Sequence, residues 1–169
     1  MSKSIVTIIS VIIICQGIAV PRSISDKPSG KHMEFRLVAV GDYMDEDATE
    51  AGFRTVGMND THLGSAKYTS SNGDTVFTYG CEFRSPEEAK RYLEWKVARS
   101  SKTVMQGVKT DATGKTVGYR VVVLLAPDQK QSAVIWTYGP LFREIIASSL
   151  ADAEEFEKQA ARQAGAGRA

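Results

Sequence analysis

Cysteine and histidine are scarce in this chain, which has two of each among its 169 residues. Two cysteines cannot build a disulfide-rich scaffold, and two histidines argue against a multi-histidine metal centre. No charge of one sign dominates either, because 21 Lys and Arg residues face 20 Asp and Glu residues. A formal charge of +1 lacks the basic footprint of a nucleic-acid-binding protein. We therefore predict no nucleic-acid partner and no cofactor.

The longest apolar run lies at the start of the chain. Lys3 is followed by an almost unbroken apolar stretch over residues 5–15, and Gly17 and Ala19 then supply small side chains before Val20. This pattern predicts a secretory signal peptide over residues 1–19, cleaved after Ala19, and export to the periplasm or the outside. The run is about half of the roughly 20 apolar residues that a bilayer-spanning helix needs. A protein held at the membrane by an uncleaved N-terminus is the alternative.

The rest of the chain has the composition of one globular domain, with 43% hydrophobic residues. Residues 20–32 contain Pro21, Pro28 and Gly30 and lack hydrophobic periodicity, which predicts a flexible leader. A single domain is expected over residues 33–164, followed by a tail of small residues over 165–169. Cleavage would leave Cys81 as the one cysteine, so the core alone must stabilise the domain.

Alternation of apolar and polar residues predicts six to eight strands. The sequence Ser71-Asn72-Gly73 lies between two β-prone segments, which is a strong hairpin signal. Cys81 shares a strand face with three aromatic residues, so we expect a buried, inert thiol in a strand that covers a core on one side. The expected strands are residues 35–40, 53–58 (the weakest), 66–70, 74–83, 103–109, 116–126, 133–138 and 141–147.

Two amphipathic helices are predicted, over residues 86–99 and 150–163. Ser85, Pro86 and Glu88 form the start signal of the first helix, with the serine as cap and the glutamate completing a capping box. Ser149 opens the second helix. Residues 121–126 are apolar on both faces, which predicts a central strand covered on both sides.

Strands, a helix, further strands and a last helix, with short connections, predict an α+β fold with a mainly antiparallel sheet. This order of elements resembles the layout of PsbP-type and Mog1-type domains, a group with varied roles. The resemblance concerns the layout only, and it implies no function.

The acidic stretch over residues 42–50 is a candidate metal or acid–base site. Carboxylates at Asp42, Asp45 and Asp47 could supply oxygen ligands to a hard cation, and His62, beside Asp60, could supply a proton-transfer group. The spacing fits no EF-hand, and charge runs are usually solvated. A solvated loop or the start of a short helix is therefore the favoured interpretation.

Three aromatic residues are candidates for ligand contact. Trp136 and Tyr138 share one strand face close to Gly139 and Pro140, and Tyr119 lies in the preceding strand. Such side chains suit a surface that is half apolar and half wet. Packing in the core under a helix also explains these side chains, and it is the favoured interpretation.

No catalytic motif is present in the sequence, so the leading hypothesis is an exported domain with a non-catalytic binding or accessory role. Its partner would be a cell-envelope protein or a small ligand. The first alternative is a hydrolase or metal-dependent protein that uses residues 42–50 with His62. The second is the membrane-anchored protein described above.

Overall fold

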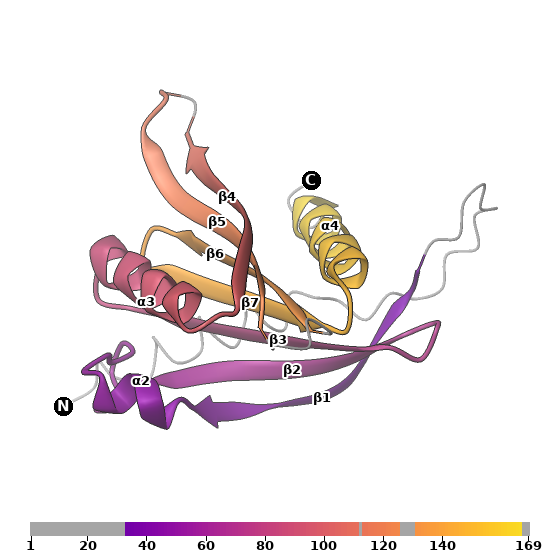
Figure 1. The fold of residues 1–169 in the computed structure, drawn as a ribbon, viewed down its shortest axis with the longest axis horizontal. Helices are drawn as coiled ribbons and strands as arrows, with labels where there is room; N and C mark the ends of the chain where they lie inside the picture. The colour runs from indigo at the N-terminus through magenta and orange to yellow at the C-terminus, as the bar shows by residue number, and fades with distance from the viewer. Residues whose placement is uncertain (1–32, 112, 126–130, 167–169) are drawn as a thin grey trace.

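The alternating segments of the chain form one seven-stranded antiparallel sheet in the computed structural model, which describes residues 33–111, 113–125 and 131–166. The strands lie in the order β1-β2-β3-β7-β6-β5-β4 (Figure 1). The predicted α+β fold with an antiparallel sheet is therefore confirmed. The strands are β1 (Phe35–Met44), β2 (His62–Ser70), β3 (Thr75–Glu82), β4 (Lys102–Thr110), β5 (Thr116–Leu124), β6 (Ser132–Tyr138) and β7 (Leu141–Ala147).

Three helices accompany the sheet among the described residues: α2 (Glu46–Glu50), α3 (Pro86–Ala98) and α4 (Leu150–Ala166). The last helix extends beyond its predicted end at residue 163. In Figure 1, α3 lies toward the end of the sheet that α2 occupies, and α4 lies toward the opposite end. The predicted signal peptide, the leader and residues 167–169 of the predicted tail lie outside the described residues.

The start of α3 follows the predicted capping pattern. The Ser85 hydroxyl accepts a hydrogen bond from the Glu88 amide at 3.1 Å. The Glu88 carboxylate in turn accepts from the amide of Arg84 at 3.2 Å, one residue before the cap. The serine contact satisfies an amide that the helix leaves free at its N-terminus. The glutamate differs from the predicted capping box, because it accepts from the residue before the cap and not from the cap itself. Tyr92 and Leu93 then face the sheet and are buried.

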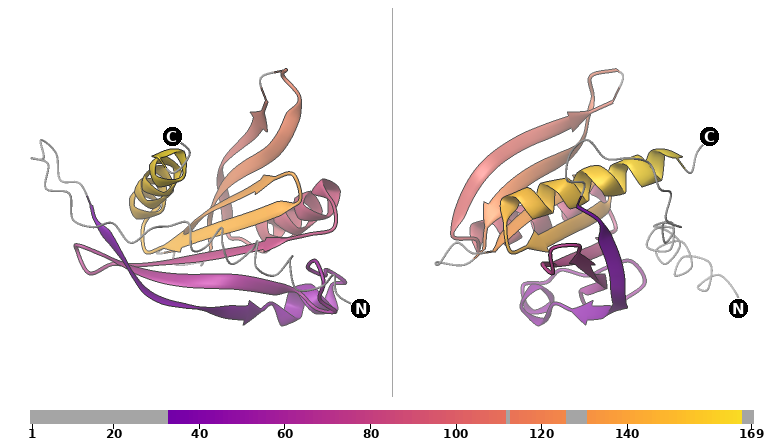
Figure 2. Two further views of the ribbon diagram at one scale, coloured as in Figure 1. Left: turned by 180° about the vertical axis from the view of Figure 1, so that it is seen from behind. Right: turned by 90° about the vertical axis from the view of Figure 1, so that its right-hand side faces the viewer.

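Both faces of the middle strands are buried, each under its own helix. Val121 and Val123 of β5 belong to the core beneath α3, whereas Val122 belongs to the core beneath α4. Figure 2 shows α4 running across the sheet in a view turned by 90° from that of Figure 1. The prediction of a doubly covered strand is confirmed, although β5 is next to the edge strand β4 and not at the centre of the sheet.

Two strand predictions are wrong. Residues 53–58 form turns instead of a strand: the Thr55 amide donates to the Asp60 carbonyl and the Met58 amide to the Thr55 carbonyl, and no ladder to a neighbouring strand is formed. Gly57 has a φ of 77°, which a strand does not allow. The strand β3 was expected to cover a core on one side, yet Val76 is fully buried on its second face, in the core of α4.

The strands β4 and β5 form a hairpin whose tip extends away from both helices (Figure 1). Every residue of β4 is exposed. At the tip, the Asp111 carboxylate accepts hydrogen bonds from the amides of Thr113 and Lys115, at 2.8 and 3.1 Å. The Thr113 hydroxyl donates to the same carboxylate oxygen at 2.6 Å. This bond, together with the two amide contacts, lowers the pKa of Asp111 and stabilises the turn.

Close to the Gly139-Pro140 turn, β5 and β6 approach each other so closely that one position admits only glycine. A Cβ atom built on Gly118 would lie 2.0 Å from the carbonyl oxygen of Thr137. On the adjacent strand β4, a Cβ atom on Gly107 would have its nearest neighbour, the Arg120 carbonyl oxygen, at 4.0 Å.

We therefore expect Gly118→Ala to lower the free energy of unfolding by about 1–3 kcal/mol or more, because backbone must move to admit the methyl group. The matched variant Gly107→Ala should stay within about 0.5 kcal/mol of wild type, since its methyl group enters open space. Urea unfolding of both variants checks this. Equal effects at the two positions would contradict the close approach of β5 and β6.

Candidate functional site

The acidic stretch does not form a loop that gathers carboxylates. Asp42 is exposed on β1, which extends to Met44, and Asp45 caps α2 by accepting a hydrogen bond from the Ala48 amide at 3.1 Å. Asp47 lies on α2 and pairs with Arg99 at 2.6 Å. Among the described residues, no three side chains of His, Cys, Asp or Glu are grouped to hold a metal ion. The favoured interpretation, a short helix start, matches this geometry.

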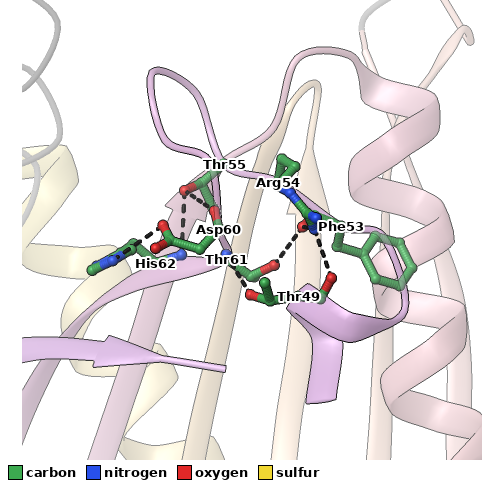
Figure 3. Close-up of polar contacts among 7 residues, drawn as sticks. All are labelled: Thr49, Phe53, Arg54, Thr55, Asp60, Thr61 and His62. Atoms are coloured by element: carbon green, nitrogen blue, oxygen red, sulfur yellow. Dashed lines mark hydrogen bonds and ion pairs between the residues drawn. The ribbon is translucent and has the colours of Figure 1, made fainter. Parts of the chain in front are cut away.

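His62 lies at the start of β2 and pairs with Asp60, with 3.2 Å between Nε2 and Oδ1 (Figure 3). Both side chains are about one-third exposed. The surrounding hydrogen bonds brace the loop itself: the Thr61 hydroxyl donates to the Phe53 carbonyl, and the Thr49 hydroxyl accepts from the Thr61 amide, each at 2.8 Å. The His62–Asp60 pair is therefore part of a turn that these hydrogen bonds stabilise.

The candidate aromatic residues divide between the two faces of the sheet. Trp136 packs on the α4 core, with the ammonium of Lys109 4.9 Å from its ring centroid and the guanidinium of Arg143 5.6 Å from it. Tyr119 packs on the α3 core beneath Lys90. Tyr138 is 55% exposed.

Tyr119 and Tyr138 both line an open groove of about 470 Å³ beside the start of α3. Pro86, Lys90 and Thr137 also line it, and Trp136 does not. The three candidate aromatic residues therefore do not form one site.

A buried cluster of charged and polar side chains is the feature that sequence analysis missed. Glu144 lies on β7 and is 1% exposed. Its Oε2 atom is 3.1 Å from the Lys96 ammonium, which is also 3.9 Å from Oδ2 of Asp45. The Tyr92 hydroxyl donates to the same Oδ2 at 2.8 Å. The cluster thus joins α2, α3 and the middle strand of the sheet.

Burial governs the proton affinities in this cluster. Loss of hydration raises the pKa of Glu144, and the neighbouring Lys96 opposes this shift. The Oε1 atom of Glu144 is buried and has no hydrogen-bond partner among the described residues. Burial likewise raises the pKa of the Cys81 thiol and that of the Tyr92 hydroxyl. Cys81 is therefore an inert, buried thiol, as its strand face predicts.

One signal in the sequence could have identified this cluster. Glu144 alternates with Phe142 and Ile146 on a strand face that should be apolar, and Lys96 lies on the inward stripe of its helix. Two opposite charges at core positions predict a buried pair. Their contact depends on the placement of α3 over β7, which no local pattern specifies.

The raised pKa of Glu144 gives a pH-dependent contribution to stability. The folded state holds the proton more tightly than the unfolded state, so this contribution is complete below the ordinary carboxyl pKa of 4.5. It declines as the pH rises from there through the raised value. Relative to Glu144→Gln, the wild type should lose stability over this range.

Urea unfolding of both proteins between about pH 4 and pH 8 measures the difference. Glu87→Gln is the matched control, because Glu87 is an exposed carboxylate on α3. A constant difference between wild type and Glu144→Gln across this range would show that the carboxyl has an ordinary pKa.

In comparisons with known proteins, the chain matches no family model, no curated protein and no solved structure. The resemblance to PsbP-type and Mog1-type domains accordingly stays a prediction about layout. Within the part of the chain that the structure describes, no helix is long and apolar enough to cross a membrane. Support for a function therefore comes from the contacts and surfaces of the chain itself.

Proposed function

We propose that the protein is an exported, non-catalytic binding domain that recognises another polypeptide at the edge strands of its sheet. The observation that carries this proposal is the placement of exposed apolar side chains. Among the described residues, ten large hydrophobic side chains are exposed, and eight of them lie on the edge strands β1 and β4. They are Leu37, Val38, Val40, Tyr43 and Met44 on β1, and Val104, Met105 and Val108 on β4.

Edge strands of this kind are suited to binding by strand addition. An edge presents unpaired amide and carbonyl groups, and exposed apolar side chains add an area that favours association. Proteins usually blunt such edges by keeping them short or covered. Here the two edges are 10 and 9 residues long, and Val40 and Val108 are 70% and 60% exposed.

The contacts of the candidate polar residues favour a binding role over hydrolysis. A hydrolase that uses the acidic stretch requires its carboxylates and His62 around one substrate. Instead Asp45 caps α2, Asp47 pairs with Arg99 and His62 pairs with Asp60. Each of these groups already has a role in stabilising a local structure.

Export is supported by the apolar run and the small residues that precede Val20. We expect the processed protein to begin at Val20 and to occur in the periplasm or the medium. N-terminal sequencing of the protein recovered from fractionated cells measures both. A chain that begins at its first residues and remains in the membrane fraction would favour the anchored alternative.

Site-specific photocrosslinking tests the binding surface. A photoreactive amino acid at Val40 or Val108 should give adducts with another polypeptide in the cells that make the protein. The same group at Arg91, which is exposed on α3, should give none. Adducts at Arg91 alone, or no adducts at either edge, would refute binding at the edge strands.

A further inference from the structure

We infer that β4 is the docking strand for an extended, acidic segment of another protein, which adds to the sheet beside β4 as an eighth strand. This inference rests on the proposed function and identifies the chemistry of the partner. Within the described part of the chain, β4 is paired on one side only, with β5. Its other side offers backbone donors and acceptors to an incoming strand.

Exposed apolar side chains give β4 a physical reason to accept a further strand. β5 is paired with β6 over residues 120–124, so β4 is the third strand of this part of the sheet and forms its margin. The tip of the hairpin extends beyond the helices (Figure 1). Along β4, Val104, Met105 and Val108 are 46–60% exposed. An added strand would bury part of the apolar surface of these side chains.

The charge of β4 selects the partner. The strand carries Lys102 and Lys109 and no acidic residue. The nearby carboxylate of Asp111 is held by amides of the turn. An acidic segment therefore gains attraction at both ends of β4, whereas a basic segment is repelled.

The register of β4 defines which residues the partner needs. From Met105 to Lys109 the strand pairs with β5 without a bulge. Directly opposite residues share a face, so Gln106 and Val108 lie on the α3 face with Val121 and Tyr119. Met105, Gly107 and Lys109 therefore lie on the α4 face.

An antiparallel partner then needs an acid opposite Lys109, an apolar residue opposite Val108 and another opposite Met105. An aromatic ring fits over Gly107, where the space above the backbone is open. A second acid belongs near Lys102. The peptide Glu-Val-Tyr-Thr-Val-Thr-Glu has this pattern.

The other edge is a poorer candidate. The bulge at Val38 interrupts β1 inside its apolar run, and the strand carries charges of both signs, Arg36 and Asp42. Of the two edge strands, β4 alone carries charged side chains of a single sign.

The test compares this peptide with Lys-Val-Tyr-Thr-Val-Thr-Lys, both capped at their termini, on the processed protein. The processed chain is formally neutral, because loss of Lys3 leaves 20 basic and 20 acidic residues. A preference must therefore arise locally. We expect the glutamate peptide to bind about tenfold tighter at about 50 mM salt, with amide shifts in NMR spectra confined to β4 and its neighbour.

Charge reversal supplies the decisive control. The variant Lys102→Glu/Lys109→Glu should prefer the lysine peptide. The variant Arg36→Glu/Lys67→Glu, which changes the net charge equally on β1 and β2 at the opposite side of the sheet, should retain the original preference. Methylation of alternate peptide amides on the edge that faces β4 should abolish binding.

Equal binding of the two peptides, a preference that survives reversal, or no saturable binding at about 1 mM would each overturn the acidic-strand proposal. If the peptide test fails in one of these ways but Val108 still gives photocrosslinks, the proposed binding function stands and the partner is not an acidic segment. If the peptide binds but neither edge crosslinks in cells, the proposed function fails and the preference of β4 is incidental.

Discussion

Burial of both faces of β5, β6 and β7 is the constraint on which the rest of the structure depends. Ala133, Val134 and Ile135 are consecutive and have no exposed surface, so this part of the sheet has no solvent side. Each face needs its own helix, because one amphipathic helix can cover one face only. The positions of α3 and α4, one on each face of the sheet, follow from this requirement.

The same constraint leaves the outer strands uncovered. Two helices cover the middle of a seven-stranded sheet, and β1 and β4 lie at its margins. The chain nevertheless places exposed valine and methionine side chains on both edges. Isolated apolar residues on a surface need no explanation, but a run of them along an unpaired edge does, and the proposed binding surface rests on this difference.

Patterns that depend on neighbouring residues were predictable from the sequence, and patterns that depend on distant contacts were not. The Ser85 cap, the hairpin at Asn72-Gly73 and the doubly apolar run at residues 121–123 each appear in the structure where the sequence places them. The strand order was missed because it depends on the pairing of β3 with the distant strand β7. The Lys96–Glu144 pair was missed because it depends on how α3 packs over β7. The strand predicted over residues 53–58 was wrong for a related reason. Phe53 is buried among aromatic side chains of α3, so it is apolar because of this tertiary contact and not because it belongs to a strand.

The lysines of β4 can act against one kind of association and in favour of another. Lysine on an edge strand is a common protection against self-association, and two copies of β4 side by side would bring four ammonium groups to one edge. The bulge at Val104 adds to this protection near the body of the domain. Neither device hinders an acidic strand, which meets the lysines with opposite charge and uses the regular backbone beyond the bulge. Protection from self-pairing and selection of an acidic partner can thus reside in the same two side chains.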